Sequence, residues 1–429
     1  HNLRLLMNEI FGEENFVESF IWRRRKTQAN LSKYTAPVHD YILCYSKSKE
    51  FLEINRIPYS KEFIKKTFKN PDNDPKGVYQ TGPLARPANS SNKEYELTMP
   101  NGRKITAKWS CSQETFDRYV AENRLVIPRD GEGMPRIKIY LSELPGQIPN
   151  SWLDNIASND EASNEIEELF GTNAFFSFPK PTKLIQHLQL IGANKDDVIL
   201  DFFAGSGTTA HAVMELNKED GGNRKYICVQ LPELCDEKSE AYKAGYKTIA
   251  DISKERIRRA GKKIQAEIEE EKKKKSGQLN FENQGNQENQ INQGSDIDLG
   301  FKVLKLADSN FKQWQQIEGK DAKALAEQMK LFVDPVSETA TIENMVYELL
   351  LKSGKDLNSR IEKKGSFYKI NDNELVLLLE KATQEIIDAV IAEKPIKVIA
   401  LDKLFKGNDQ LKTNTVLQMK DAGVEFKTI

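Results

Sequence analysis

Two glycines and two hydroxyl-bearing residues follow directly on an apolar stretch, at Gly205-Ser206-Gly207-Thr208. The preceding residues, Asp197–Phe203, have the composition of a buried strand, and a helical pattern begins at Thr208. Glycine lets the backbone approach a ligand closely, and the first turn of a helix offers free N–H groups and a partial positive charge. The segment therefore predicts a ligand-binding turn between a strand and a helix.

The residues present and absent at this turn indicate the ligand. A phosphate-binding loop of the G-x-x-x-x-G-K-S/T kind needs a lysine, which the turn lacks. A dinucleotide turn, G-x-G-x-x-G, needs a third glycine where this chain has Ala210, and the carboxylate of Asp201 would repel a pyrophosphate. A carboxylate beside a helix N-terminus instead suits a ligand with both an ammonium and a carboxylate group, such as S-adenosylmethionine. A plain tight turn without a ligand is the alternative.

The elements that position this turn alternate between helix and strand. Periodicity predicts the following helices and strands around the turn: Val17–Trp22 (strand), Tyr41–Tyr45 (strand), Thr182–Ile191 (helix), Asp197–Phe203 (strand), Thr208–Asn217 (helix), Lys225–Gln230 (strand) and Ile252–Ile268 (helix). A strand, a helix and a second strand at this spacing predict a right-handed βαβ unit on a parallel sheet. The expected fold class is therefore α/β.

Three segments resemble motifs of amino-group DNA methyltransferases. Asp201–Thr209 resembles their motif I, D-x-F-x-G-S-G-T-T, and Phe176–Pro181 (FSFPKP) resembles their motif X. Motif X directly before motif I is the β-type circular order. Lys225–Glu233 (KYICVQLPE) resembles the next strand, whose terminal acid meets the ribose hydroxyls of the cofactor.

The resemblance implies a partial Rossmann-like sheet that binds S-adenosylmethionine, with an inserted target-recognition region and a smaller C-terminal α/β domain. For Glu233, a solvated loop carboxylate is the alternative. By this resemblance the cofactor-binding residues are Phe178, Lys180, Asp201, Phe203, Gly205, Ser206, Gly207, Thr208 and Glu233.

The resemblance extends over nearly the whole chain. Residues 11–47 resemble the stretch after the catalytic loop of these enzymes, and Arg136–Trp152 resembles the end of the recognition insert. Leu299–Val303 and residues 401–414 resemble the C-terminal domain of modification (Mod) subunits of type III restriction-modification systems. The resemblance implies methylation of adenine N6 in DNA, with cytosine N4 as the alternative. The implied partners are double-stranded DNA, a second copy of the chain and a restriction (helicase-nuclease) subunit.

One motif of this family does not occur in the sequence. These enzymes hold the target amine with Asp/Asn/Ser-Pro-Pro-Tyr/Phe/Trp, and the chain contains no Pro-Pro pair. In the β order this tetrapeptide comes before the region at which the chain starts, with His1 rather than Met. We therefore expect an amino-terminally truncated enzyme that is inactive alone, and assign no catalytic residue. A non-catalytic DNA-recognition and assembly subunit is one alternative, and a nicotinamide-dependent oxidoreductase is another.

Charge and composition bear on partners and location. Residues 1–150 hold 24 Lys and Arg against 18 Asp and Glu, although the whole chain has a net charge of −1. A basic front half is compatible with a polyanionic partner, and the candidates for DNA phosphate contacts are Arg23, Arg24, Arg25 and Lys26, with a solvated loop as the alternative. No apolar run approaches the ~18 residues that span a bilayer, and no secretory signal is present, which predicts a cytoplasmic protein without membrane contact. Scattered cysteines and histidines predict no metal site.

Frequent turn-forming residues, polar tracts and stretches with apolar periodicity divide the chain into five predicted parts. Residues 269–298 are rich in charge and then in Gln, Asn and Gly, and we expect a linker there. The expected parts are 1–50, methyltransferase core after the missing catalytic loop; 51–170, target-recognition region; 171–268, cofactor-binding part of the core; 269–298, polar linker; and 299–429, a smaller α/β assembly domain. In the last part we expect helices near 341–352 and 381–392 and strands at Leu375–Leu379, Lys397–Leu401 and Val424–Ile429.

Overall fold

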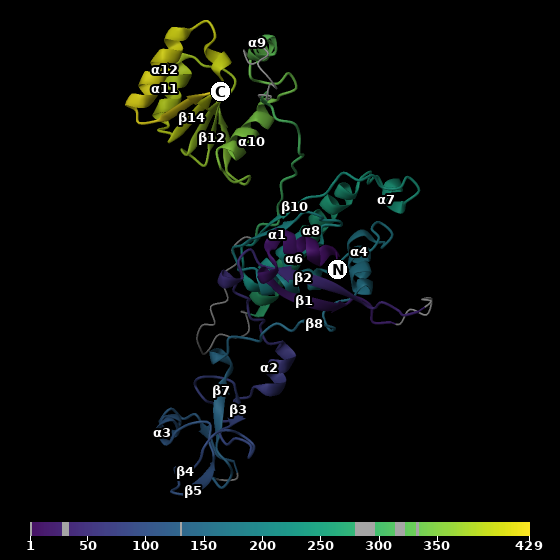
Figure 1. Ribbon diagram of the computed structural model, residues 1–429, viewed down its shortest axis with the longest axis vertical. Helices are drawn as coiled ribbons and strands as arrows, with labels where there is room; N and C mark the ends of the chain where they lie inside the picture. Colours follow the sequence, from purple (N-terminus) through teal and green to yellow (C-terminus); the bar gives the residue numbers. More distant parts are fainter. Residues whose placement is uncertain (1, 28–33, 129–130, 279–296, 314–321, 332–333) are drawn as a thin grey trace. The chain divides into compact units, whose positions relative to one another are not determined.

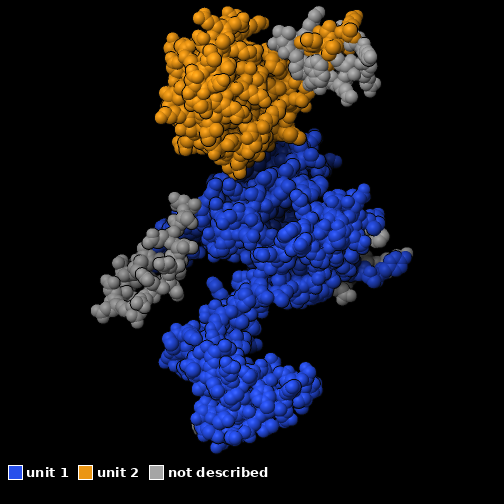
Figure 2. Space-filling view, turned by 60° about the vertical axis from the view of Figure 1, so that its left-hand side comes forward, with its two compact units in different colours: residues 1–301 blue, residues 302–429 orange. Residues whose placement is uncertain are grey.

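The computed structural model describes residues 2–27, 34–128, 131–278, 297–313, 322–331 and 334–429. The chain divides into two compact units, residues 1–301 (unit 1) and residues 302–429 (unit 2), which Figure 2 shows in blue and orange. Both units mix helices and strands, and each has its own apolar core. No helix in the described ranges is long and apolar enough to cross a membrane.

A βαβ element occupies the middle of unit 1. Strand β9 (Val198–Asp201) leads into helix α6 (Thr208–Asp220), and β10 (Lys225–Cys228) returns parallel to β9. This confirms the predicted order of strand, helix and strand. Helix α6 is buried over most of its length because it packs between α5 (Thr182–Gly192) and α8 (Ile249–Gln278).

The strands of unit 1 outside residues 51–150 form two separate sheets in the described residues. Strand β1 (Phe16–Arg23) pairs antiparallel with β2 (His39–Tyr45) and parallel with β8 (Trp152–Leu153). Strands β9 and β10 form a sheet of their own. The mixed α/β class is therefore observed, but the single Rossmann-like sheet implied by the motifs is not seen among these residues.

Among the described residues, a core of α6 and α8 covers one face of the small β9–β10 sheet. Tyr226 and Cys228 pack against the core formed by α6 and α8. Alternate residues of a strand point to opposite faces, so the other face carries apolar side chains that remain about half exposed: Val198 at 56%, Leu200 at 58%, Ile227 at 47% and Val229 at 48%.

Residues 51–150 form short elements around a small core of their own, which contains Leu97, Trp109 and Phe116. Strands β3, β7 and β6 make one antiparallel sheet, and β4 and β5 make a hairpin. The elements are α2 (Lys61–Thr67), β3 (Tyr79–Pro83), β4 (Glu94–Thr98), β5 (Lys104–Lys108), α3 (Gln113–Ala121), β6 (Leu125–Val126) and β7 (Arg136–Tyr140).

A buried lysine ties two parts of this region together. Nζ of Lys138, on β7, donates to the carboxylates of Asp72 and Asp74, each at 2.6 Å, and only 1% of the residue is exposed. The hydroxyls of Tyr79 and Tyr140 donate to the same two carboxylates. The hydrogen bond from Lys138 is the main reason why the pKa of Asp74 is lowered to about 2.

The described part of unit 1 also contains the α-helices α1 (Asn2–Phe11), α4 (Asn159–Phe170) and α7 (Glu240–Lys243). Helix α4 begins with a capping box, in which Ser158 and Glu161 satisfy free backbone N–H groups of the first turn. It ends at Gly171, which has the left-handed conformation. Helix α8 continues to Gln278. The first ten residues of the linker expected at 269–298 are therefore helical, while residues 279–296 lie outside the described residues.

Unit 2 is a five-stranded sheet with helices on both faces (Figure 1). Strands β11, β12 and β13 are antiparallel, and β13, β14 and β15 are parallel. Helix α10 packs on one face, and α11 and α12 pack on the other. The elements are α9 (Ala322–Leu331), α10 (Ile342–Lys352), β11 (Ile361–Lys364), β12 (Phe367–Ile370), β13 (Leu375–Leu378), α11 (Gln384–Ala392), β14 (Lys397–Ala400), α12 (Asp409–Asp421) and β15 (Glu425–Thr428). The helices and strands predicted for this part are present.

Candidate functional site

The turn between β9 and α6 uses backbone conformations that favour glycine. Gly205 has φ +54° and Gly207 has φ +80°, which is the left-handed region. A Cβ on Gly207 would lie 3.1 Å from the carbonyl oxygen of Ser253, in α8, whereas a Cβ on Gly205 would make only ordinary contacts. Gly205 is thus needed for the turn itself, and Gly207 also allows α6 to approach α8.

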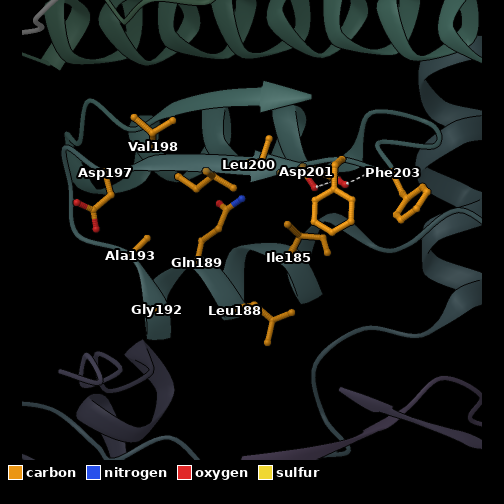
Figure 3. Close-up of a pocket in the computed structure, with 13 residues that line it drawn as sticks. Ile185, Leu188, Gln189, Gly192, Ala193, Asp197, Val198, Leu200, Asp201 and Phe203 are labelled. Carbon is orange, nitrogen blue, oxygen red and sulfur yellow. Dashed lines mark hydrogen bonds between the residues drawn. The ribbon is translucent and has the colours of Figure 1, made fainter. Parts of the chain in front are cut away.

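The carboxylate of Asp201 closes the turn at the end of β9. Its Oδ1 accepts from the backbone N–H of Phe203 at 3.1 Å, and its Oδ2 accepts from the hydroxyl of Thr209 at 2.5 Å (Figure 3). On the other side, the N–H of Gly205 donates to Oε1 of Gln230 at 2.7 Å, which joins the turn to the end of β10. These bonds fix the turn relative to both strands.

A buried arginine lies beneath the turn. Arg256, in α8, has no exposed surface, and its guanidinium donates to Oγ of Ser206 at 2.7 Å and to Oγ1 of Thr208 at 2.8 Å. It also donates to Oε2 of Glu165 at 3.1 Å and to Oγ1 of Thr182 at 3.2 Å. Burial lowers the pKa of Arg256 to about 10, against the opposing effects of Glu165 and Glu215, so the side chain is charged at neutral pH.

Arg256 and Glu165 were not among the residues predicted from the sequence. One signal was available for the arginine. Ile252, Arg256 and Ala260 follow one another at intervals of four on the buried stripe of α8, where a charged residue is unusual. No comparable signal marks Glu165, whose partner is 91 residues away in the sequence.

The hydroxyls of Ser206 and Thr208 point inward. The two residues are 3% and 5% exposed. Since a guanidinium can only donate, both hydroxyl oxygens accept from Arg256, and Thr208 donates in turn to the carbonyl of Lys180 at 3.2 Å. In this structure the two side chains therefore hold the turn, and any contact between these residues and a ligand runs through their backbone.

The segment that resembles motif X lies beside the turn. The carbonyl of Lys180 accepts from Thr208, and the ring of Phe176 comes within 3.5 Å of the Cβ position of Gly205. Phe178, with φ +59°, is 79% exposed. The structure thus brings together two segments that the sequence separates by about 25 residues.

Two other predicted residues lie at the ends of the strands. Phe203, just past β9, is 78% exposed. Glu233 follows β10, and its side chain is exposed, while its backbone carbonyl accepts from the N–H of Ile249 at 2.9 Å. Phe203 and Glu233 therefore present exposed side chains beyond the carboxyl ends of the two parallel strands.

A cavity of about 710 Å³ runs along the outer edge of β9, between this strand and α5 (Figure 3). Leu188 and Gln189 line it from the helix, Val198 and Leu200 from the strand, and Asp201 at the turn. Gln189 is 5% exposed and points toward β9, and within the described parts of the chain neither atom of its amide has a hydrogen-bond partner. The volume falls within the ~300–1,000 Å³ typical of ligand pockets.

The basic run at 23–26 is partly neutralised by local carboxylates. Nε of Arg24 pairs with Asp40 at 3.2 Å, and Nζ of Lys26 pairs with Glu161 at 2.7 Å. The guanidinium of Arg23 donates to the backbone carbonyls of the residues that follow it. Arg23 and Arg25 are therefore the members of the run without a carboxylate partner among the ion pairs of the described residues.

The front part of the chain, with its motifs, matches a known protein family. Residues 1–244 match the N6_N4_Mtase family model, described as DNA methylase. The chain is 40% identical over 268 residues to the Mod subunit of the type III restriction-modification enzyme StyLTI of Salmonella typhimurium, covering 62% of this chain and 41% of that protein.

Two further relatives show the same pattern. The EcoPI Mod subunit of Escherichia phage P1 is 32% identical over 299 residues, covering 61% of this chain and 45% of that protein. The type II methyltransferase M.KpnI of Klebsiella pneumoniae is 30% identical over 289 residues, covering 60% and 65%. The chain spans less than half the length of the two Mod subunits.

These matches confirm the resemblance to modification subunits that the motifs indicated. The matched residues include the turn at 204–208, the segment at 176–181 and both strands of the β9–β10 sheet. Because the family model covers more than half of its residues, the chain belongs to the DNA methylase family.

Proposed function

We propose that this chain is the cofactor-binding and DNA-recognition part of a site-specific DNA methyltransferase of a type III restriction-modification system. The transferred group is a methyl from S-adenosylmethionine, and the acceptor is adenine N6. The observation that carries the proposal is the packing of the FSFPKP segment against the glycine turn at the N-terminus of α6, within a chain of the DNA methylase family. Cytosine N4 is the alternative acceptor.

The residues at the turn fit S-adenosylmethionine. The N-terminus of α6 suits the carboxylate of the methionine moiety, and the turn of Gly205–Thr208 has the backbone shape that a close approach needs. Exposed Phe178 and Phe203 offer apolar surface for the adenosine, and the exposed carboxylate of Glu233 offers acceptors for ribose hydroxyls. When bound, the cofactor supplies an electrophilic methyl group, and the residues named here bind and orient it.

The 429 residues contain no Pro-Pro tetrapeptide to hold a target amine. Orientation of the reacting groups supplies a large part of the rate of such a transfer. We therefore expect the chain alone to transfer no methyl group to DNA, and radiolabelled methyl incorporation above background from the purified chain would contradict this.

Titration calorimetry with S-adenosylmethionine and with NAD tests the cofactor assignment. We expect binding of the first and none of the second. Asp201→Ala removes the acceptor that closes the turn, and Gly205→Val places a branched side chain on a residue with φ +54°, so both should weaken binding. Gly171→Val is the matched control, because Gly171 also has a positive φ but ends α4. Parent-like affinity of both turn variants would contradict the assignment.

A non-catalytic DNA-recognition and assembly subunit is the second candidate, favoured by the absence of a Pro-Pro pair. A subunit of that kind needs no cofactor, so the same titration separates the two proposals. In either case we propose that residues 51–170 select the DNA sequence. Unit 2 would then serve contacts with a second copy and with a helicase-nuclease subunit. Loss of self-association on removal of residues 302–429 would support this role, and unchanged self-association would contradict it.

A further inference from the structure

We propose that Arg256 is a positioning residue that gives the glycine turn its preference for the carboxylate of the cofactor's methionine moiety. The inference rests on the proposed function and adds a residue that does not itself touch the ligand. The guanidinium of Arg256 contacts the glycine turn and the helices α4, α5 and α6.

Arg256 lies between the first residues of two helices. Thr182 is the first residue of α5 and Thr208 is the first residue of α6, and the guanidinium donates to both side chains. Its other partners are Ser206, in the turn, and Glu165, in α4. A single side chain of α8 therefore fixes the relative positions of the turn and of the starts of α5 and α6.

The electrostatic balance at this point favours an additional anion. Each helix N-terminus carries a partial positive charge, and Arg256 adds a full one without any exposure to water. Glu165 is the carboxylate that the guanidinium contacts, and this carboxylate is shared with the N–H and the hydroxyl of Thr182. Glu215 also acts on the guanidinium electrostatically. Nη1 of Arg256 contacts the hydroxyls of Ser206 and Thr208, whereas Nη2 contacts Glu165, so the side of the guanidinium that faces the N-terminus of α6 contacts neutral hydroxyls.

A buried ion pair is costly to desolvate, and replacing both of its members by apolar side chains of similar volume often causes no loss of stability. Stability alone therefore does not explain an arginine in the apolar stripe of α8. A ligand carboxylate at the N-terminus of α6 would lie on the side of the guanidinium that contacts Ser206 and Thr208. Because the interior has a low effective dielectric constant, the charge acts on such a group across the layer of Ser206 and Thr208.

The chain of hydrogen bonds that begins at Arg256 runs outward from the guanidinium as the first donor. Arg256 donates to both hydroxyl oxygens, and Thr208 donates onward to the carbonyl of Lys180. The hydroxyls are thereby held inward, and the backbone of the turn keeps one conformation. Removal of Arg256 would release the two hydroxyls and remove the charge at the same time, so the test needs variants that separate these effects.

Arg256→Met removes the charge and Arg256→Lys keeps it. Arg224→Met is the matched control: Arg224 is 6% exposed and pairs with Asp220 at the other end of α6. Calorimetric titration of each variant uses S-adenosylmethionine and decarboxylated S-adenosylmethionine, which lacks only the carboxylate. We expect Arg256→Met to weaken binding of the first about tenfold, as for the loss of one nearby charge, and binding of the second much less.

Arg256→Lys should keep most of the preference for the carboxylate, and Arg224→Met should keep all of it. An equal loss for both ligands in Arg256→Met, or no loss for either, overturns the proposal. If the parent chain binds neither ligand, the proposed function fails.

A measurement without ligand tests whether the contacts of Arg256 hold the turn. Hydrogen–deuterium exchange of the amides at 204–209 should be faster in Arg256→Met than in the parent, and unchanged in Arg224→Met. Unchanged exchange at the turn in Arg256→Met overturns the positioning role whatever the titrations show.

Discussion

Replacing Gly207 by alanine tests the close approach of α6 and α8 behind the turn. A residue with a Cβ costs about 1–2 kcal/mol in the left-handed region, and Gly207 has φ +80°. The added Cβ would also lie 3.1 Å from the carbonyl oxygen of Ser253, so α8 must give way by a few tenths of an ångström. Overpacking of this kind costs about 1–3 kcal/mol. We expect a total loss of about 2–5 kcal/mol in the free energy of unfolding.

Gly171 provides the matched control for the same substitution. It has the same φ of +80°, but nothing lies within 4 Å of its Cβ position. Gly171→Ala therefore reports the backbone strain alone, about 1–2 kcal/mol, and the difference between the two variants reports the contact with Ser253.

Differential scanning calorimetry of the full chain measures this difference, because unit 2 supplies a transition that neither substitution should move. A loss of 1 kcal/mol lowers the melting temperature of a domain of this size by about 2–4 °C. Gly207→Ala should therefore melt at least about 2 °C below Gly171→Ala. Equal melting temperatures for the two variants would refute the close approach.

Three further outcomes are expected. Replacing Arg23 and Arg25 by alanine should weaken binding to all DNA sequences about equally and reduce the slope of affinity against salt concentration, whereas a changed sequence preference at an unchanged slope would speak against phosphate contacts. Burial raises the pKa of Glu348, but donors from Lys352, Ser309 and Asn310 outweigh it and lower the pKa to about 2. The ionised carboxylate of Glu348 therefore stabilises unit 2 above pH 4.5, its ordinary pKa, and this contribution is lost as the pH falls toward 2. The melting temperature of unit 2 in Glu348→Gln should be lower than that of the parent at pH 7 and should fall less on acidification. Identical pH profiles of the two melting temperatures would contradict this. Residues 302–429 expressed alone should unfold cooperatively, because both faces of their sheet are covered by their own helices, and a non-cooperative thermal transition would show that this unit needs the rest of the chain.

The positions of single helices and strands were accessible from the sequence because periodicity is a local signal. β9, α6 and β10 lie where the pattern placed them, within a few residues at each end. The charged run at the end of α8 lies within the segment predicted as a linker, and its helical form was not predicted. It has no apolar face, and its helical form is supported instead by pairs such as Lys274 with Glu270, four residues apart.

Long-range partners left no such signal. The bond between Arg256 and Glu165 joins residues 91 apart, and that between Lys138 and Asp74 joins residues 64 apart. Sequence patterns also do not say which strands pair, so the division of β1 and β9 between two sheets was not predicted. The candidate turn was predicted because its glycines and its neighbouring carboxylate are consecutive, whereas the arginine that holds it comes from another helix.

The half-exposed face of the β9–β10 sheet has a practical consequence for experiments in solution. Val198, Leu200, Ile227 and Val229 form an apolar surface on a short pair of strands and the residue that follows it, and such surfaces promote aggregation between molecules. Association through this face should grow with protein concentration and remain after removal of residues 302–429. Light scattering over a dilution series of both versions therefore distinguishes colloidal clustering at the sheet from assembly through unit 2.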